Sequence, residues 1–166
     1  MIRACLLANG GLFADGHTHP WFTTPLMKSR AGGPLMWGGQ RSRRGFAPIF
    51  RSVFSRSYRV TAAEIEQDYQ AISRRDGVRV LPATAAYVDE HREHAARWDL
   101  ARIAGELGGA VRFRVVGSRE DRFEARQLRL ARERLGDAVE STELPGGHLA
   151  TAEQPRRLAE LIVGLR

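Results

Sequence analysis

The sequence contains very little cysteine: Cys5 is the only one among 166 residues. A single cysteine excludes an intrachain disulfide and a metal cluster held by several thiolates. Long apolar runs are also absent, since none approaches the roughly 20 residues that a helix needs to span a bilayer. The first residues, MIRACLLANGG, are too short and too weakly charged for a secretory signal. We therefore expect a cytoplasmic protein that does not associate with membranes.

Lysine is nearly absent as well, although the formal net charge is +7 and the pI is about 10.8. Lys28 is the only lysine, and the arginines are spread along the chain and interleaved with acids, as in ARERLGD. The densest basic cluster lacks the interleaved aromatic residues of a surface that stacks bases; it comprises Arg41, Arg43 and Arg44. We expect no nucleic-acid partner, and a basic nucleic-acid binder is the least favoured alternative.

Hydrophobic residues make up 43% of the sequence and charged residues 27%, which is typical of one soluble globular domain with a real core. Residues Ile2 to Ala8 form a short apolar run that ends at Asn9-Gly10-Gly11. This pattern predicts a buried strand followed by a sharp turn. Residues 12–60 alternate helix breakers with bulky aromatic residues, which indicates short helices rather than strands.

The middle of the sequence carries clearer helix signals. Thr61 and Glu64 have the spacing of a capping box, in which each side chain satisfies a free backbone donor near the other residue. We expect this helix to end at Asp76-Gly77, and a second helical region to run over residues 81–107. Gly108-Gly109 then marks the boundary to the last part of the chain.

The residues after Gly109 alternate between strand and helix patterns. Strands are predicted at 111–116 and 138–144, and helices at 123–135 and 151–166. Strand, helix, strand and helix at this short spacing imply parallel strands joined by right-handed crossovers. The sequence therefore predicts an α/β fold with about three parallel strands and flanking helices.

Acidic residues and a histidine follow the last two predicted strands. The run VRFRVVGSREDRF ends in Glu120 and Asp121, and STELPGGHL delivers His148 into a glycine-rich turn. A buried carboxylate fixes the tautomer of an imidazole, which then activates a hydroxyl nucleophile or a water. An acid and a histidine at neighbouring strand tips are candidates for two parts of a catalytic triad, whereas a histidine in a turn, taken alone, is more often structural.

These segments resemble the α/β-hydrolase family. RVVGSREDRF is similar to the family's seventh strand with its triad acid, and PGGHLATAEQP to the eighth strand, the triad histidine and the start of the final helix. LLANGGLF resembles the sixth strand, and the helical region after it resembles the family's cap. NGGLF, RRDG, AAYVDEHREHAARWDLA and the pair Phe46 and Phe50 are similar to the haloalkane dehalogenase and epoxide hydrolase branch, which includes the mesoderm-specific transcript protein.

The resemblance implies a partial α/β-hydrolase fold in three parts. Residues 1–11 would be the first core strand, residues 12–108 a helical cap, and residues 109–166 the C-terminal α/β core. It also implies hydrolysis of an ester, an epoxide or a carbon–halogen bond in a small apolar substrate, without a metal or an organic cofactor.

The same resemblance implies roles for individual residues. His148 corresponds to the triad histidine, and Asp121 to the carboxylate that orients it. Glu120 is the alternative acid, because the family usually places the acid three residues after the glycine. Asp15, close to the end of the first strand, lies where this branch can hold an alternative acid, although a polar loop is the simpler interpretation.

The nucleophile that the family requires is not found in the sequence. No serine has glycines two residues before and after it, no aspartate stands in an equivalent elbow, and the HGGG-type oxyanion segment is absent. We therefore expect the C-terminal half of such a hydrolase, inactive alone, whose first strand exposes an apolar edge. That edge would pair with an N-terminal half or with a second copy of the chain. The alternative function is a non-catalytic, oligomerising interaction module.

Three smaller features have simple structural interpretations. His91 and His94 favour a solvated helix face over a metal site, because a third ligand is not evident. Glu153 is expected to cap or pack at the start of the final helix, without a catalytic role. The tryptophans are expected to form cap core more readily than a substrate pocket; they are Trp21, Trp37 and Trp98.

Overall fold

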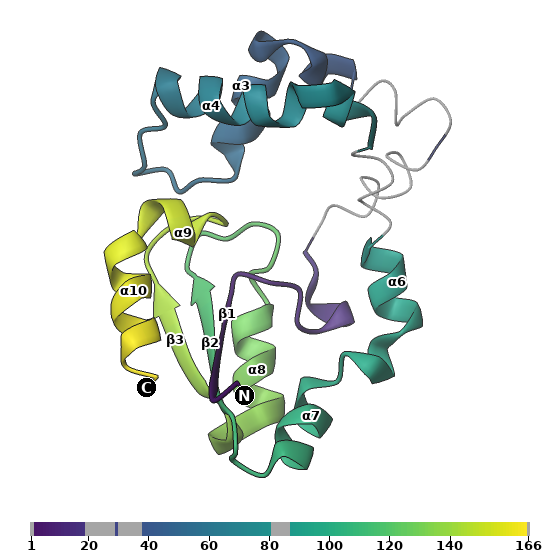
Figure 1. Ribbon diagram of the computed structural model, residues 1–166, viewed down its shortest axis with the longest axis vertical. Helices are drawn as coiled ribbons and strands as arrows, with labels where there is room; N and C mark the ends of the chain where they lie inside the picture. The colour runs from purple at the N-terminus through teal and green to yellow at the C-terminus, as the bar shows by residue number, and fades with distance from the viewer. Residues whose placement is uncertain (1, 19–28, 30–37, 81–86, 166) are drawn as a thin grey trace.

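The computed structural model describes residues 2–18, 29, 38–80 and 87–165 (Figure 1). Its centre is a parallel sheet in the order β1-β2-β3, formed by β1 (Ala4–Ala8), β2 (Arg112–Ser118) and β3 (Glu140–Leu144). Leu7 stands opposite Val115 in the register of the first pair, and Val115 stands opposite Ser141 in the second. The predicted α/β fold with three parallel strands and flanking helices is therefore confirmed.

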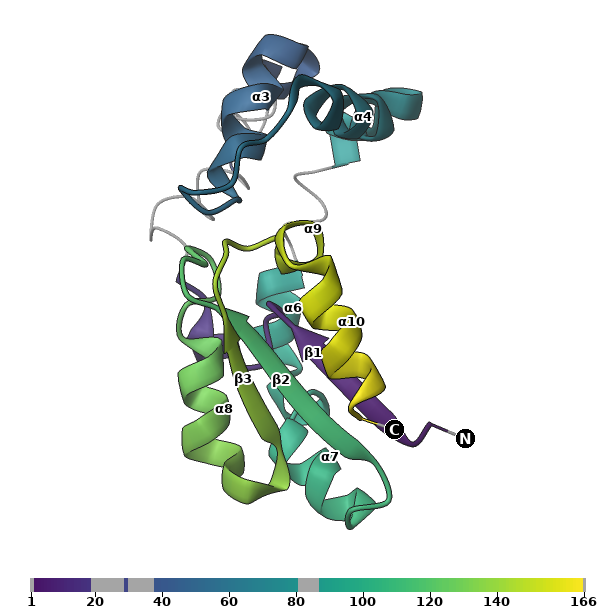
Figure 2. The same ribbon diagram turned by 90° about the vertical axis from the view of Figure 1, so that its left-hand side faces the viewer.

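The two faces of the sheet are covered by different helices (Figure 2). The helices α7 (Leu100–Leu107) and α8 (Gln127–Leu135) pack against one face, and α10 (Pro155–Val163) packs against the other. β2 divides its side chains between them, since Phe113 and Val115 belong to the core under α8, and Val116 to the core under α10. β2 is therefore buried on both faces, by apolar side chains that point to opposite sides of the sheet.

β1 lies at an edge of the sheet formed by the described strands, although it is apolar on both faces. Cys5 and Leu7 pack against the core under α8, and Leu6 and Ala8 pack against the core under α10. All of its residues are only half-buried. The first strand therefore has the side chains of a central strand in the position of an edge strand.

A helical segment lies beyond the carboxyl ends of the strands (Figure 1). It contains α3 (Arg43–Ser52) and α4 (Ala62–Ser73). The predicted capping box is confirmed, because the Thr61 hydroxyl accepts from the Glu64 backbone N–H and the Glu64 carboxylate accepts from the Thr61 backbone N–H. Phe46 of α3 packs against Tyr69 of α4, with ring centroids 5.8 Å apart.

The rest of the chain between the strands is built from short elements. α6 (Tyr87–Glu93) leads through a single 3-10 turn into α7. The 3-10 segments are η1 (Ala14–Gly16), η2 (Gly39–Arg41), η3 (Arg74–Val80), η4 (Ala95–Arg97) and η5 (Gly136–Ala138). None of the helices in the described ranges combines the length and apolarity needed to cross a membrane.

Several predicted helices have different bounds in the structure. α4 ends at Ser73 rather than at Asp76-Gly77, and the helical region predicted at 81–107 is interrupted by η4 in its described part. The helix predicted at 123–135 begins only at Gln127, because the residues before it form the turn that holds Asp121. The helix predicted at 151–166 is divided into α9 (Ala150–Glu153) and α10. The break falls at Gln154, whose φ of −130° and ψ of 46° are not helical, because the ring of Pro155 disfavours a helical residue before it.

Candidate active site

Asp121 and His148 meet beyond the carboxyl ends of β2 and β3. The two strands are parallel neighbours, so the loops that follow them lie side by side. Nδ1 of His148 lies 3.0 Å from Oδ2 and 3.1 Å from Oδ1 of Asp121. The Asp121 side chain is 2% exposed and the His148 side chain 30% exposed. The acid is therefore buried beneath a histidine that still reaches the surface.

The Asp121 carboxylate is held by its own turn as well as by His148. Its Oδ1 accepts from the backbone N–H groups of Phe123 at 2.9 Å and Glu124 at 3.1 Å. Burial by itself would raise the pKa of Asp121, but the hydrogen bonds from His148 and from these backbone donors outweigh it and lower the pKa below its ordinary value. Asp121 is therefore a carboxylate at neutral pH.

The hydrogen bond with Asp121 raises the pKa of His148, and burial opposes this effect. The negative charges of Asp121 and Glu124 act in the same direction as the hydrogen bond. The ring of Phe123 contacts the imidazole edge-on, at 5.2 Å between centroids. Nε2 has no hydrogen-bond partner within the described ranges. An imidazole held at Nδ1 by a carboxylate and free at Nε2 is able to take a proton from a nucleophile.

The turn that carries His148 is fixed by residues distant in sequence. Nδ2 of Asn9 donates to the carbonyl oxygens of Gly147 at 2.9 Å and of His148 at 2.8 Å, and also lies 2.8 Å from Oγ of Ser118. Asn9 has a φ of 45°, the left-handed conformation that asparagine tolerates better than most residues. The sequence showed Asn9 as part of a turn, but gave no signal that its side chain would reach the histidine loop.

The other candidate acids lie elsewhere. Oε2 of Glu120 accepts from the backbone N–H of Arg56 at 3.2 Å, and this side chain borders a cavity of about 370 Å³ with Phe54 and Arg122. Asp15 forms a surface ion pair with Arg134, which holds the pKa of Asp15 below its ordinary value. The structure brings Asp121 to His148, and neither Glu120 nor Asp15 hydrogen-bonds to that imidazole.

A second histidine–carboxylate cluster lies between α6 and α8. Nδ1 of His17 is 2.9 Å from Oε1 of Glu124, and Nε2 of His17 is 3.4 Å from Nδ1 of His91. Gln127 donates to the other Glu124 oxygen at 2.8 Å. The prediction of a solvated face is correct for the exposed His94 but wrong for His91, which is 8% exposed and packs against His17. Burial, and then the charge of His17, lower the pKa of His91.

No group of three or more histidine, cysteine, aspartate or glutamate side chains among the described residues is placed to hold a metal ion. The His17, His91 and Glu124 contacts therefore form a buried polar network rather than a recognisable metal centre. This network fastens α6 to the loop after β2. Its residues are separated by 74 and 107 positions in the sequence, which is why the spacing of the histidines on their own helix did not reveal it.

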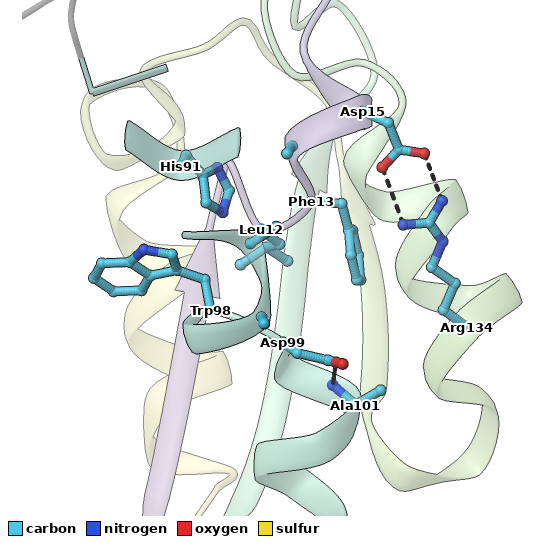
Figure 3. Close-up of a pocket in the computed structure, with 11 residues that line it drawn as sticks. Leu12, Phe13, Asp15, His91, Trp98, Asp99, Ala101 and Arg134 are labelled. Atoms are coloured by element: carbon cyan, nitrogen blue, oxygen red, sulfur yellow. Dashed lines mark hydrogen bonds and ion pairs between the residues drawn. The ribbon is translucent and has the colours of Figure 1, made fainter. Parts of the chain in front are cut away.

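A pocket of about 460 Å³ lies beside this network (Figure 3). Trp98 forms its outer wall and is 59% exposed, while Leu12 and Phe13 form its apolar interior. Asp15 and Arg134 pair at the opposite rim. Trp98 is thus a pocket wall rather than core, and the pocket includes neither Asp121 nor His148. Trp21 and Trp37 lie outside the described residues.

No serine hydroxyl in the described part of the chain hydrogen-bonds Nε2 of His148. Ser118 Oγ donates to Oδ1 of Asn9 at 3.2 Å. Ser55 Oγ donates to Oε2 of Glu153 at 2.5 Å.

The sequence is similar to two curated proteins of Mycobacterium tuberculosis that carry the name "Putative hydrolase LipZ", from strains CDC 1551 / Oshkosh and ATCC 25618 / H37Rv. Each is 28% identical over 130 residues, which cover 75% of this chain and 42% of the relative. The chain thus spans less than half the length of these relatives. No protein-family model matches the sequence, and no solved structure matches it.

Proposed function

We propose that this chain supplies the acid and the histidine of an α/β-hydrolase active site, with His148 as the general base and Asp121 as its orienting carboxylate. The observation that carries the proposal is the pair itself: a buried carboxylate bonded to Nδ1 at 3.0 Å, with Nε2 left without a partner among the described residues. The 28% identity to proteins named as hydrolases supports the same chemistry.

In this mechanism Nε2 of His148 takes the proton of a hydroxyl nucleophile, or of a water that attacks an ester intermediate. The ionised Asp121 keeps the proton of the neutral imidazole on Nδ1 and stabilises the imidazolium that forms. The leaving group then receives the proton back from Nε2. The substrates we propose are small apolar molecules with an ester, an epoxide or a carbon–halogen bond, attacked without a metal or an organic cofactor.

The nucleophile in this proposal comes from residues outside the sequence. β1 offers the place where they would join, because its side chains are apolar on both faces while its outer edge has no neighbour among the described strands. A parallel strand added there would bury the half-exposed residues of β1. Residues 12–108 would be the cap, since α3 and α4 lie beyond the strand ends that carry Asp121 and His148 (Figure 1).

The test supplies the missing nucleophile. The DNA directly upstream of the codon for Met1 is searched for an in-frame G-x-S-x-G or G-x-D segment, and that polypeptide is expressed with this chain and assayed on p-nitrophenyl butyrate. We expect ester hydrolysis that His148→Ala lowers roughly a million-fold. The chain alone should show only background hydrolysis. Turnover that survives His148→Ala would refute the role of His148.

A second function is supported by the same edge of β1. A strand with Cys5 and Leu7 on one face and Leu6 and Ala8 on the other presents an apolar, unprotected edge to a second copy of the chain. Under this alternative the chain is an oligomerising interaction module. Light scattering of the purified chain would then give a dimer or larger assembly, with no upstream elbow segment in the genome. A stable monomer at high concentration that binds no hydrophobic dye would count against it.

A further inference from the structure

One carboxylate joins three separate segments next to His148. Oε1 of Glu153, in α9, accepts from the backbone N–H of Gly147 at 2.8 Å and from the backbone N–H of Ser55 at 2.9 Å. Oε2 of the same side chain accepts from the Ser55 hydroxyl at 2.5 Å. Glu153 therefore connects α9, the histidine turn, and the connection between α3 and α4. Figure 1 shows this connection reaching down toward α9.

The backbone contacts around Glu153 are close. The N–H of His148 donates to the carbonyl of Val53 at 2.7 Å, so the helical segment supplies an acceptor to the histidine itself. A Cβ on Gly147 would lie 2.5 Å from the backbone N of Ser55 and 2.6 Å from the carbonyl oxygen of Val53. Glycine at position 147 is thus required for the two backbones to meet. The turn bearing His148 docks on residues 53–55 by main-chain contact.

The histidine turn is consequently held from two sides. Asn9 lies at the end of β1, and its side chain donates to the carbonyls of Gly147 and His148. The Glu153 carboxylate instead accepts from the backbone N–H groups of both Gly147 and Ser55, and so links the two residues. Asn9 fixes the turn to the sheet, whereas Glu153 fixes the turn to the helical segment.

We propose that Glu153 is a positioning residue that couples docking of residues 53–55 to the orientation of the His148 imidazole over Asp121. Glu153 makes no contact with the imidazole, so it acts through the main chain of Gly147 and His148. The proposal rests on the proposed function for its catalytic meaning. If the connection between α3 and α4 moves away, the N–H of His148 loses its acceptor, the carbonyl of Val53, and Glu153 no longer joins Gly147 to Ser55. The geometry of the bond between Nδ1 and Asp121 then changes.

The experiment compares Glu153→Ala with Glu153→Gln by NMR titration of His148 in the purified chain. The glutamine variant is the matched control, because its carbonyl oxygen still accepts from Gly147 and Ser55 although its charge is gone. We expect Glu153→Gln to leave the pKa of His148 and its Nδ1–H signal near the wild-type values. Glu153→Ala should shift the pKa of His148 back toward about 6.5 and weaken the Nδ1–H signal.

Equal shifts in the two variants would overturn the proposal, because the effect would then be electrostatic. Loss of stability in Glu153→Ala with an unchanged His148 signal would overturn it too, since the role would be merely structural. If Glu153→Ala does not fold, hydrogen exchange in the wild-type chain decides. The amides of Gly147 and Ser55 share one acceptor oxygen, so we expect them to open together with equal protection, and independent exchange would contradict the coupling.

None of these measurements requires turnover. If the chain expressed with the upstream polypeptide shows no hydrolysis but the NMR shifts are as expected, the proposed function is refuted and the coupling through Glu153 stands. If hydrolysis depends on His148 but the NMR titration of His148 is the same in Glu153→Ala and Glu153→Gln, the proposed function stands and the coupling through Glu153 is refuted.

Discussion

Two histidine–carboxylate pairs of this protein have their acids, Asp121 and Glu124, in the same loop after β2. The pairs differ in the contacts of the second imidazole nitrogen, Nε2. Asp121 binds Nδ1 of His148 at 3.0 Å, and Glu124 binds Nδ1 of His17 at 2.9 Å. The His148 side chain is 30% exposed and its Nε2 has no partner among the described residues. The His17 side chain is 2% exposed, and its Nε2 contacts His91.

The comparison shows that a carboxylate at Nδ1 does not by itself make an active site. Both carboxylates are nearly inaccessible, at 2% and 3% exposure, so burial of the acid does not separate the pairs. The difference lies in access to Nε2, because only a free nitrogen can exchange a proton with a substrate or nucleophile. This difference supports the proposal that the pair of His148 and Asp121 is catalytic, whereas the pair of His17 and Glu124 stabilises the fold.

The largest difference is expected in catalysis by the completed enzyme. Asp121→Asn should lower kcat/KM about ten thousand-fold, because a neutral amide neither fixes the reactive tautomer nor stabilises the imidazolium. Glu124→Gln is the matched control, and it should change kcat/KM by less than about tenfold. Ester hydrolysis measures both. A larger loss in Glu124→Gln than in Asp121→Asn would exchange the roles of the two pairs.

The second difference is expected in stability. Glu124→Ala removes a buried carboxylate that hydrogen-bonds both His17 and Gln127, so the free energy of unfolding should fall by roughly 3 kcal/mol. Urea denaturation followed by circular dichroism measures it. Glu133→Ala is the control, because Glu133 forms an exposed pair with Arg129 that should contribute less than about 0.5 kcal/mol. Equal losses in the two variants would contradict an architectural role for Glu124.

The third difference is the sign of the pH dependence of stability. The pKa of His148 is raised in the folded chain. Its contribution to the free energy of unfolding is therefore fully present below about pH 6.5 and is lost as the pH rises through the pKa of the folded chain. The lowered pKa of Asp121 makes its contribution present above about pH 4 and lost as pH falls through the folded-state value. The pair therefore stabilises the fold most between these limits.

His91 should show the opposite slope. Burial and the charge of His17 lower its pKa, so the unfolded chain binds the proton more readily and stability declines as pH falls below about 6.5. The midpoint of urea denaturation is measured between pH 5 and pH 8. Asp121→Asn should remove the part of its pH dependence that comes from His148, and His91→Gln should remove the part that comes from His91. Slopes of the same sign for the two histidines would contradict the assigned pKa directions.

The smallest expected effect is a difference in chemical accessibility. Diethyl pyrocarbonate, read by mass spectrometry, should modify His148 and the exposed His94 several-fold faster than His17 and His91, because only exposed imidazoles react readily. Rapid modification of His17 in the folded chain would show that the buried network is open in solution.

The sequence predicted the pair but not its surroundings. Strand and helix periodicity placed Asp121 and His148 after neighbouring parallel strands, and the resemblance to hydrolases named them, with Glu120 left as an alternative. Contacts that depend on side chains distant in sequence were not predictable from periodicity. Asn9 is separated by 139 positions from His148, and Glu153 by 98 from Ser55, and both were interpreted only locally.

The error at His91 has the same origin. Its helix pattern with His94 and two glutamates indicates a solvated face, and the burial of His91 arises from His17, 74 positions away. The division of the last helix was, by contrast, present in the sequence, since Pro155 disfavours a helical conformation at the residue before it. Local rules held where the cause was local, and failed where the fold brought distant residues together.

The most direct test of the central claim is an NMR titration of His148 in the wild-type chain and in Asp121→Asn. We expect a neutral imidazole protonated at Nδ1, a pKa of His148 above about 6.5, and a fall in that pKa when the Asp121 charge is removed. A pKa of His148 at or below about 6.5 that does not respond to Asp121→Asn would show that Asp121 does not orient and charge-stabilise this imidazole.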